Sequence, residues 1–159
     1  MWPWLIGVGV VLAIVFTAIP MARAYRRCEA REGLRLFRLR REMLEARFFD
    51  LARTQDKPRG LRWIECDWQN AVTFAREKES GLLTAFVAVN IRFEAVEGGD
   101  MEGVAAVATI REAAAVFHYR QGVWGTGGRA LFNMTPQDAV RQLTGQFDPL
   151  PSDVLVTRS

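Results

Sequence analysis

The pattern of hydrophobic and polar positions changes twice along the chain, and each part predicts a different element. The first 22 residues contain no charged side chain, and ten residues between Trp4 and Met21 are Leu, Ile, Val or Phe. About 20 helical residues at 1.5 Å each cross a hydrocarbon layer of about 30 Å, so this run predicts a transmembrane helix. Trp2 and Trp4 stand at its start, where an interfacial aromatic belt is expected.

Arginines dominate the segment that follows the apolar run. Residues 23–41 carry two glutamates and eight arginines, which are Arg23, Arg26, Arg27, Arg31, Arg35, Arg38, Arg40 and Arg41. Because positively charged flanks stay in the cytoplasm, we expect a single-pass membrane protein with its N-terminus outside and its C-terminal domain in the cytoplasm. The lipid bilayer is then its first partner. The residues that flank this anchor are Trp2, Trp4, Arg23, Arg26, Arg27 and Arg31.

Two other interpretations of the N-terminus stay open. Ala22-Arg23-Ala24 has the A-x-A form of a signal-peptide cleavage site, but no Lys or Arg precedes the apolar run as a signal peptide would require. A buried core helix is the second interpretation, and the lack of any polar face argues against it. Both observations favour a membrane helix that is not cleaved.

Residues 22–54 predict a helix that continues from the membrane. Its apolar positions follow 3-4 spacing and form one stripe of Leu34, Phe37, Leu44, Phe48 and Leu51. Arg41 is the discordant position, Leu36, Leu39 and Met43 widen the apolar surface, and Gly33 marks a candidate bend. The stripe has three possible uses, which are packing on the protein's own sheet, pairing with a second copy, or lying in the membrane interface. We favour the first, since fewer than three heptads give little support to a coiled coil.

After a break at 54–60 the apolar period becomes two, which predicts antiparallel strands. The clearest strand is Leu83–Ala95, where every odd position is apolar and the last even positions are polar or charged. Further strands are expected from the alternating stretches 61–68 and 71–76, at about 106–119, at 123–124 and at 130–132, although the alanines of 104–116 also suit a helix. A loop is expected at 97–103.

A short helix should follow the sheet. Thr135 can cap its first amides, Pro136 suits the first helical position, and Gly145 ends the helix. The chain then divides into an anchor at 1–22, a basic amphipathic helix at 23–56, a small α+β domain at 57–146 and a flexible tail at 147–159. We expect a sheet of about four to five strands. This element order is similar to cystatin-like and NTF2-like architecture.

The charge of the chain is unevenly distributed. Residues 1–41 carry a net charge of +6 and residues 42–159 carry −3, although the total is +3. A nucleic-acid-binding domain would carry basic residues on its own surface, so this distribution argues against nucleic acid as a partner.

No residue forms a recognisable catalytic, cofactor or metal motif. His118 is the only histidine, and Cys28 and Cys66 lie far apart, so we expect no metal and no cofactor. The carboxylates beside Cys66 should raise the pKa of its thiol, whereas Cys28 stands among arginines as a candidate for lipidation. The glycines of 125–128 suggest a bulge or close packing rather than a phosphate loop, and the acidic loop at 97–102 lacks the spacing of a calcium loop.

Three tryptophans in the sheet region are candidates for a pocket or a contact surface. These are Trp63, Trp68 and Trp124. Trp63 and Trp68 have opposite parity, so a regular strand would place one of them on the outer face, and a bulge near Asp67 would cancel that inference.

From these features we expect a membrane-anchored interaction module without catalysis, which binds a protein partner or a second copy. One alternative is a small-molecule pocket or enzyme between helix and sheet, lined by Trp63, Trp68 or Phe86. The other is an exported domain that begins at Tyr25 after its leader is cleaved.

Overall fold

The computed structural model describes residues 3–55 and 60–155. It contains a long N-terminal helix, an antiparallel sheet and short helices after the sheet, so the predicted α+β class is confirmed. The predicted break at 54–60 lies largely outside the described residues, between the end of the first helix at Gln55 and the first strand at Leu61.

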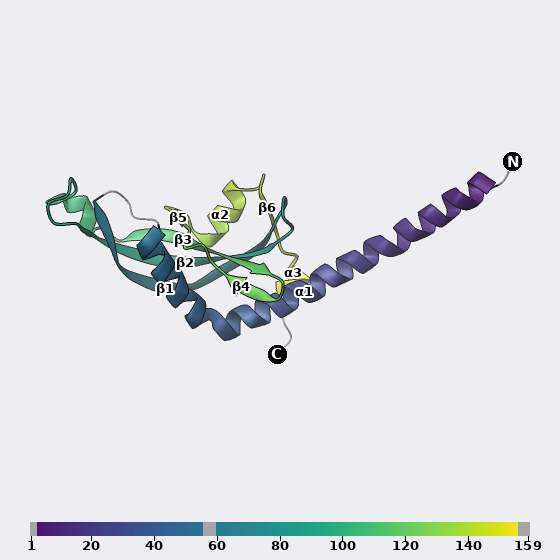
Figure 1. The fold of residues 1–159 in the computed structure, drawn as a ribbon, viewed down its shortest axis with the longest axis horizontal. Helices are drawn as coiled ribbons and strands as arrows, with labels where there is room; N and C mark the ends of the chain where they lie inside the picture. The colour runs from purple at the N-terminus through teal and green to yellow at the C-terminus, as the bar shows by residue number, and fades with distance from the viewer. Residues whose placement is uncertain (1–2, 56–59, 156–159) are drawn as a thin grey trace.

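One continuous helix, α1 (Pro3–Gln55), carries both the apolar run and the amphipathic stripe. Figure 1 shows its N-terminal part projecting away from the sheet, while its C-terminal part bends and lies along the sheet. Residues 7–28 are exposed throughout, and burial begins at Ala30. The helix therefore has an exposed N-terminal part, residues 7–28, and a C-terminal part that packs on the sheet from Ala30 onward.

The sheet has six strands in the described residues, and all its pairings are antiparallel. The strands are β1 (Leu61–Glu77), β2 (Leu83–Ala95), β3 (Arg111–Arg120), β4 (Val123–Gly125), β5 (Ala130–Phe132) and β6 (Phe147–Pro149). Their order is β4-β3-β2-β1-β6, and β5 pairs with β3 beside β4. The strand predicted at Leu83–Ala95 has the bounds of β2. Its odd positions are apolar and lie on the face toward α1, whereas Leu83–Val87 are buried on both faces.

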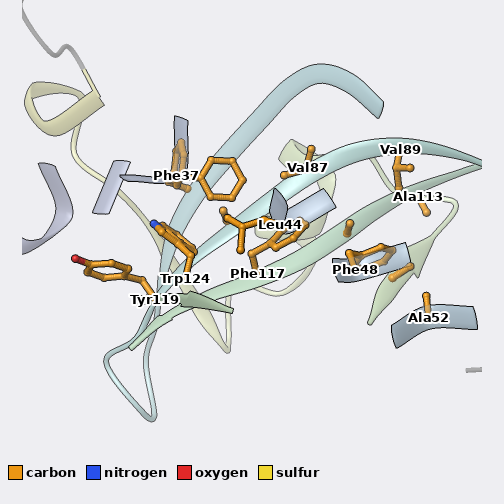
Figure 2. Close-up of a cluster of buried hydrophobic side chains, with 14 of the residues drawn as sticks. Phe37, Leu44, Phe48, Ala52, Val87, Val89, Ala113, Phe117, Tyr119 and Trp124 are labelled. Carbon is orange, nitrogen blue, oxygen red and sulfur yellow. The ribbon is translucent and has the colours of Figure 1, made fainter. Parts of the chain in front are cut away.

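Helices cover both faces of this sheet. The α1 stripe packs on one face, where Leu34, Phe37, Leu44 and Phe48 are buried and Leu51 is half-buried. Figure 2 shows Phe37, Leu44 and Phe48 of this stripe among the sheet side chains Val87, Phe117 and Trp124. Helix α2 (Pro136–Gln142), capped by Thr135 as predicted, packs on the other face through Ala139 and Val140. The prediction that the stripe packs on the protein's own sheet is confirmed.

Gly33 serves close packing between α1 and the sheet. Gly33 is buried, and a Cβ built there would lie 2.6 Å from Leu83 Cδ2. Its carbonyl accepts a hydrogen bond of 2.7 Å from the indole nitrogen of Trp124. The absence of a side chain therefore lets the helix backbone reach the sheet.

Three boundaries differ from the sequence predictions. Helix α2 ends at Gln142, although Gly145 was expected to end it. The strand expected from about 106 begins at Arg111, because 105–108 form the short 3-10 helix η1 (Ala105–Ala108). The flexible tail expected at 147–159 is wrong for its described part, since β6 pairs with β1 and is followed by α3 (Ser152–Leu155). Phe147 and Val154 are buried, so burial of these apolar side chains holds the segment on the domain.

Candidate membrane-proximal site

The candidate site lies where the exposed N-terminal part of α1 meets the sheet domain. A stretch near the N-terminus is long and apolar enough to cross a membrane, and none of it is buried. Its side chains Val11, Leu12, Ile14 and Phe16 are more than half exposed. The arginines that follow begin directly at the end of the apolar run, with Arg23, Arg26 and Arg27 all exposed.

Arg76 of β1 joins the sheet to this part of the helix. Its Nη1 donates to the Glu29 carboxylate at 3.2 Å and to the Gly81 carbonyl at 2.7 Å. Its Nη2 donates to the backbone carbonyl of Arg26 at 3.2 Å. Because the Arg76 side chain is only 15% exposed, these charge-assisted bonds fix α1 against the turn between β1 and β2.

The C-terminal segment forms the opposite wall of the site. Val154 is buried against α1, and Asp153 lies 3.5 Å from the Arg27 guanidinium. Leu150 donates its backbone amide to the Phe74 carbonyl at 3.4 Å, which ties the segment to β1. The segment that the sequence suggested to be a tail is therefore part of the site.

Between these walls lies a groove of about 340 Å³, which we call the arginine groove. It is lined by Arg23, Arg26, Arg27, Ala30, Arg76, Leu150, Pro151 and Val154. One side is cationic and the other apolar. Of the predicted flank, Arg31 is exposed but does not line the groove, and the side chains of Trp2 and Trp4 lie outside the described residues.

Trp63 and Trp68 lie on the same face of the sheet, so the prediction from their parity is wrong. Between Trp63 and Glu65, β1 contains one residue more than the paired part of β2. This register shift brings the Trp68 side chain to the same face of the sheet as Trp63. Both rings contact Phe48 of α1, at centroid distances of 6.3 Å and 5.4 Å. Trp124 also packs inward, 4.9 Å from the Phe37 ring. These rings fill the space between α1 and the sheet, which gives no support to a pocket there.

An open cleft of about 570 Å³ lies instead at the edge of the sheet, and His118 and Trp124 line it. His118 is half-buried, with Nδ1 3.2 Å from the hydroxyl of the buried Thr84. Burial lowers the pKa of His118, Glu77 opposes this shift, and Arg120 and Arg129 add to it. The imidazole is therefore held in its neutral form near pH 7, beside a hydroxyl that is itself buried.

The remaining candidates have structural explanations. Burial raises the pKa of the Cys66 thiol to about 12, with Glu65 adding to the shift, in the direction predicted. Cys28 is exposed. The glycine loop crosses α1, where a Cβ on Gly128 would lie 2.8 Å from the Ala52 backbone nitrogen, so Gly128 permits close packing. A Cβ on Gly125 or Gly127 would have nothing within 4 Å. Among the described residues, no group of three or more His, Cys, Asp or Glu side chains is arranged to hold a metal.

Sequence reasoning missed Arg76 and Asp153 as members of the membrane-proximal site. Arg76 contacts residues 47 and 50 positions away, and no local pattern reports such a contact. Comparison of the chain with protein-family models, with curated proteins and with solved structures found no match.

Proposed function

We propose that this chain is a single-pass membrane protein that holds a small, non-catalytic interaction domain at the cytoplasmic face of the membrane. The observation that carries the proposal is the division of α1, which is exposed all round at residues 7–28 and buries one face against the sheet between Ala30 and Ala52. The apolar surface of residues 7–22 needs an apolar environment, and the bilayer supplies one.

The arginine flank supports the orientation. Arg23, Arg26, Arg27 and Arg31 follow the apolar run within ten residues. Because the bias of positive charge sets the side on which a flank remains, the sheet domain belongs in the cytoplasm. The contacts of Arg76 with α1 support a domain that stands directly at the membrane surface.

The end of the sheet opposite the anchor supports the interaction role. Figure 1 places the β2–β3 connection at that end. This connection exposes Val96, Val104 and Ile110, each more than 40% accessible. Exposed apolar side chains of this kind suit contact with a protein partner or with a second copy of the chain.

Topology mapping tests the anchor and its orientation. A reporter at each terminus, with protease added to intact cells, should place the C-terminal domain inside and leave it protected. The protein should also remain in the membrane pellet after alkaline carbonate extraction. Digestion of the domain from outside, or a mature chain that begins at Tyr25, would overturn the proposal in favour of an exported domain.

The interaction role needs a separate test. The intact chain, crosslinked in membranes and then measured by native mass spectrometry in detergent, should carry a second copy or a co-purifying protein. Replacing Val104 and Ile110 by lysine should abolish that species without changing the far-UV circular dichroism. A monomer with no partner would contradict the interaction role while leaving the anchor intact.

A further inference from the structure

We propose that the arginine groove binds the phosphate of an anionic phospholipid headgroup, and that this contact fixes how the domain stands on the membrane. The inference rests on the proposed function, because it places the groove at the surface of the bilayer. It names one partner of that site, a phospholipid with net negative charge.

In the proposed topology the groove lies at the height of the lipid headgroups. Arg23 to Arg27 follow Ala22, the last residue of the uncharged run, by one to five residues. At about 1.5 Å per residue this is about 2–8 Å along the helix axis. The headgroup layer on each side of a bilayer is about 5–8 Å thick. A helix standing near the membrane normal therefore brings this side of the groove to the level of the lipid phosphates.

The cationic side of the groove carries guanidinium groups, which are suited to bind phosphate. Arginine presents a planar fork of donors that matches two phosphate oxygens at once. Among the described residues, neither Arg23 nor Arg26 has an ion pair, so both have donors available. Arg76 is already paired with Glu29 and two backbone carbonyls, so Arg23 and Arg26 are the donors that the phosphate engages.

The apolar side of the groove favours a lipid over a soluble anion. Leu150, Pro151 and Val154 line the groove opposite the arginines. A free phosphate ion has no apolar surface to bury against these side chains. The glycerol and first methylenes of a lipid do, and burying them there stabilises the bound lipid. The combination favours a lipid headgroup over a soluble anion.

A competing anion already lies at the rim. Asp153 pairs with Arg27 at 3.5 Å, and both side chains are about half exposed. An exposed pair of this kind is weak, so a lipid phosphate can displace the Asp153 carboxylate. The lipid then holds the C-terminal segment and α1 together through Arg27.

The test uses the full chain in micelles doped with phosphatidylglycerol or with phosphatidylcholine, and native mass spectrometry counts the retained lipids. Phosphatidylglycerol should be retained selectively. R23Q/R26Q should reduce that retention at least tenfold. The matched control is R38Q/R40Q, which removes the same charge from exposed positions of α1 outside the groove, and it should change retention less than twofold.

A gain of binding separates the site from damage to the fold. D153N removes the competing carboxylate and should raise phosphatidylglycerol retention severalfold. Equal losses in R23Q/R26Q and R38Q/R40Q would overturn the proposal in favour of diffuse attraction. Equal retention of the two lipids, or displacement by millimolar inorganic phosphate, would also overturn it. None of these results depends on cellular orientation, so the topology experiment fails or succeeds independently.

Discussion

Gly128 lies where the loop between β4 and β5 crosses α1. Its φ is +73°, and a Cβ there would lie 2.8 Å from the Ala52 nitrogen and 3.0 Å from Leu51 Cβ. Gly128→Ala should therefore destabilise the domain by about 2–4 kcal/mol, from backbone strain together with overpacking. Urea unfolding in detergent micelles, followed by tryptophan fluorescence, measures the change in the free energy of unfolding. Gly127→Ala is the control, since nothing lies within 4 Å of its Cβ, and equal effects would contradict the argument.

Arg41 interrupts the apolar stripe because it stabilises an irregularity in β1. Its Nε donates to Glu45 at 2.6 Å, and its Nη2 donates to the carbonyl of Gln69. Gln69 lies within the register shift between Trp68 and Val72, where the carbonyl lacks a regular ladder partner. Arg41→Met should cost about 1–3 kcal/mol in the free energy of unfolding, although it completes the stripe.

The control for Arg41 is Arg40→Met, because Arg40 is the exposed neighbour on the same helix. It should change the free energy of unfolding by less than about 0.5 kcal/mol. A stabilising effect of Arg41→Met, measured in the same urea titration, would show that hydrophobic continuity outweighs the hydrogen bonds to Gln69 and Glu45.

Cys66 should make stability depend on pH in the alkaline range. Its pKa is about 12 in the folded chain, against an ordinary value of 9.0, so the folded state retains the proton that the unfolded state loses. The free energy of unfolding should therefore fall as pH rises from about 9 toward 12. Below about pH 9 the Cys66 thiol is protonated in both states, so it adds no pH dependence there. Urea midpoints at pH 8 and pH 10.5 should lie closer together in Cys66→Ala, where Tyr119, whose pKa burial also raises, still contributes to the pH dependence. An identical pH dependence in the variant would be the contrary result.

At the scale of elements, local patterns predicted what local forces decide. The alternation of β2 and the cap of α2 are written in neighbouring residues, and both were predicted correctly. The tryptophans of β1 were misassigned because a single extra residue near Glu65 reverses parity, and no residue type marks that bulge. The alanines before Arg111 suit several conformations, so the start of β3 was also misplaced.

The C-terminal elements β6 and α3 depend on contacts with β1 and α1, far away in the sequence. Val154→Ala should destabilise the domain by about 1–3 kcal/mol, because its side chain is 1% exposed. Leu155→Ala removes more atoms from the adjacent position, yet it should cost less because Leu155 is 41% exposed. Thermal unfolding in detergent compares the two, and a larger loss for Leu155→Ala would mean that α3 is not docked through Val154.

At the scale of the whole molecule, the distribution of charge follows the distance from the apolar helix. Residues 1–41 carry +6, whereas residues 42–159 carry −3. Arg23, Arg26 and Arg27 line a groove with Arg76, and in the proposed topology the same arginine-rich flank biases the side on which the domain remains. The membrane-proximal site could not be read from the sequence, because its walls come from α1, β1 and the segment after β6.

Orientation should therefore respond to the nearest arginines. Replacing Arg23, Arg26, Arg27 and Arg31 by glutamine, and placing two lysines before Trp4, reverses the charge bias across the apolar run. A C-terminal reporter should then appear outside in a substantial share of chains, because the positive flank now precedes the helix. Glutamine at Arg35, Arg38 and Arg40 is the control, and it should preserve orientation because the four arginines nearest the membrane remain. If the first variant keeps its domain inside, the folding of the domain before insertion, rather than the arginine flank, determines the topology.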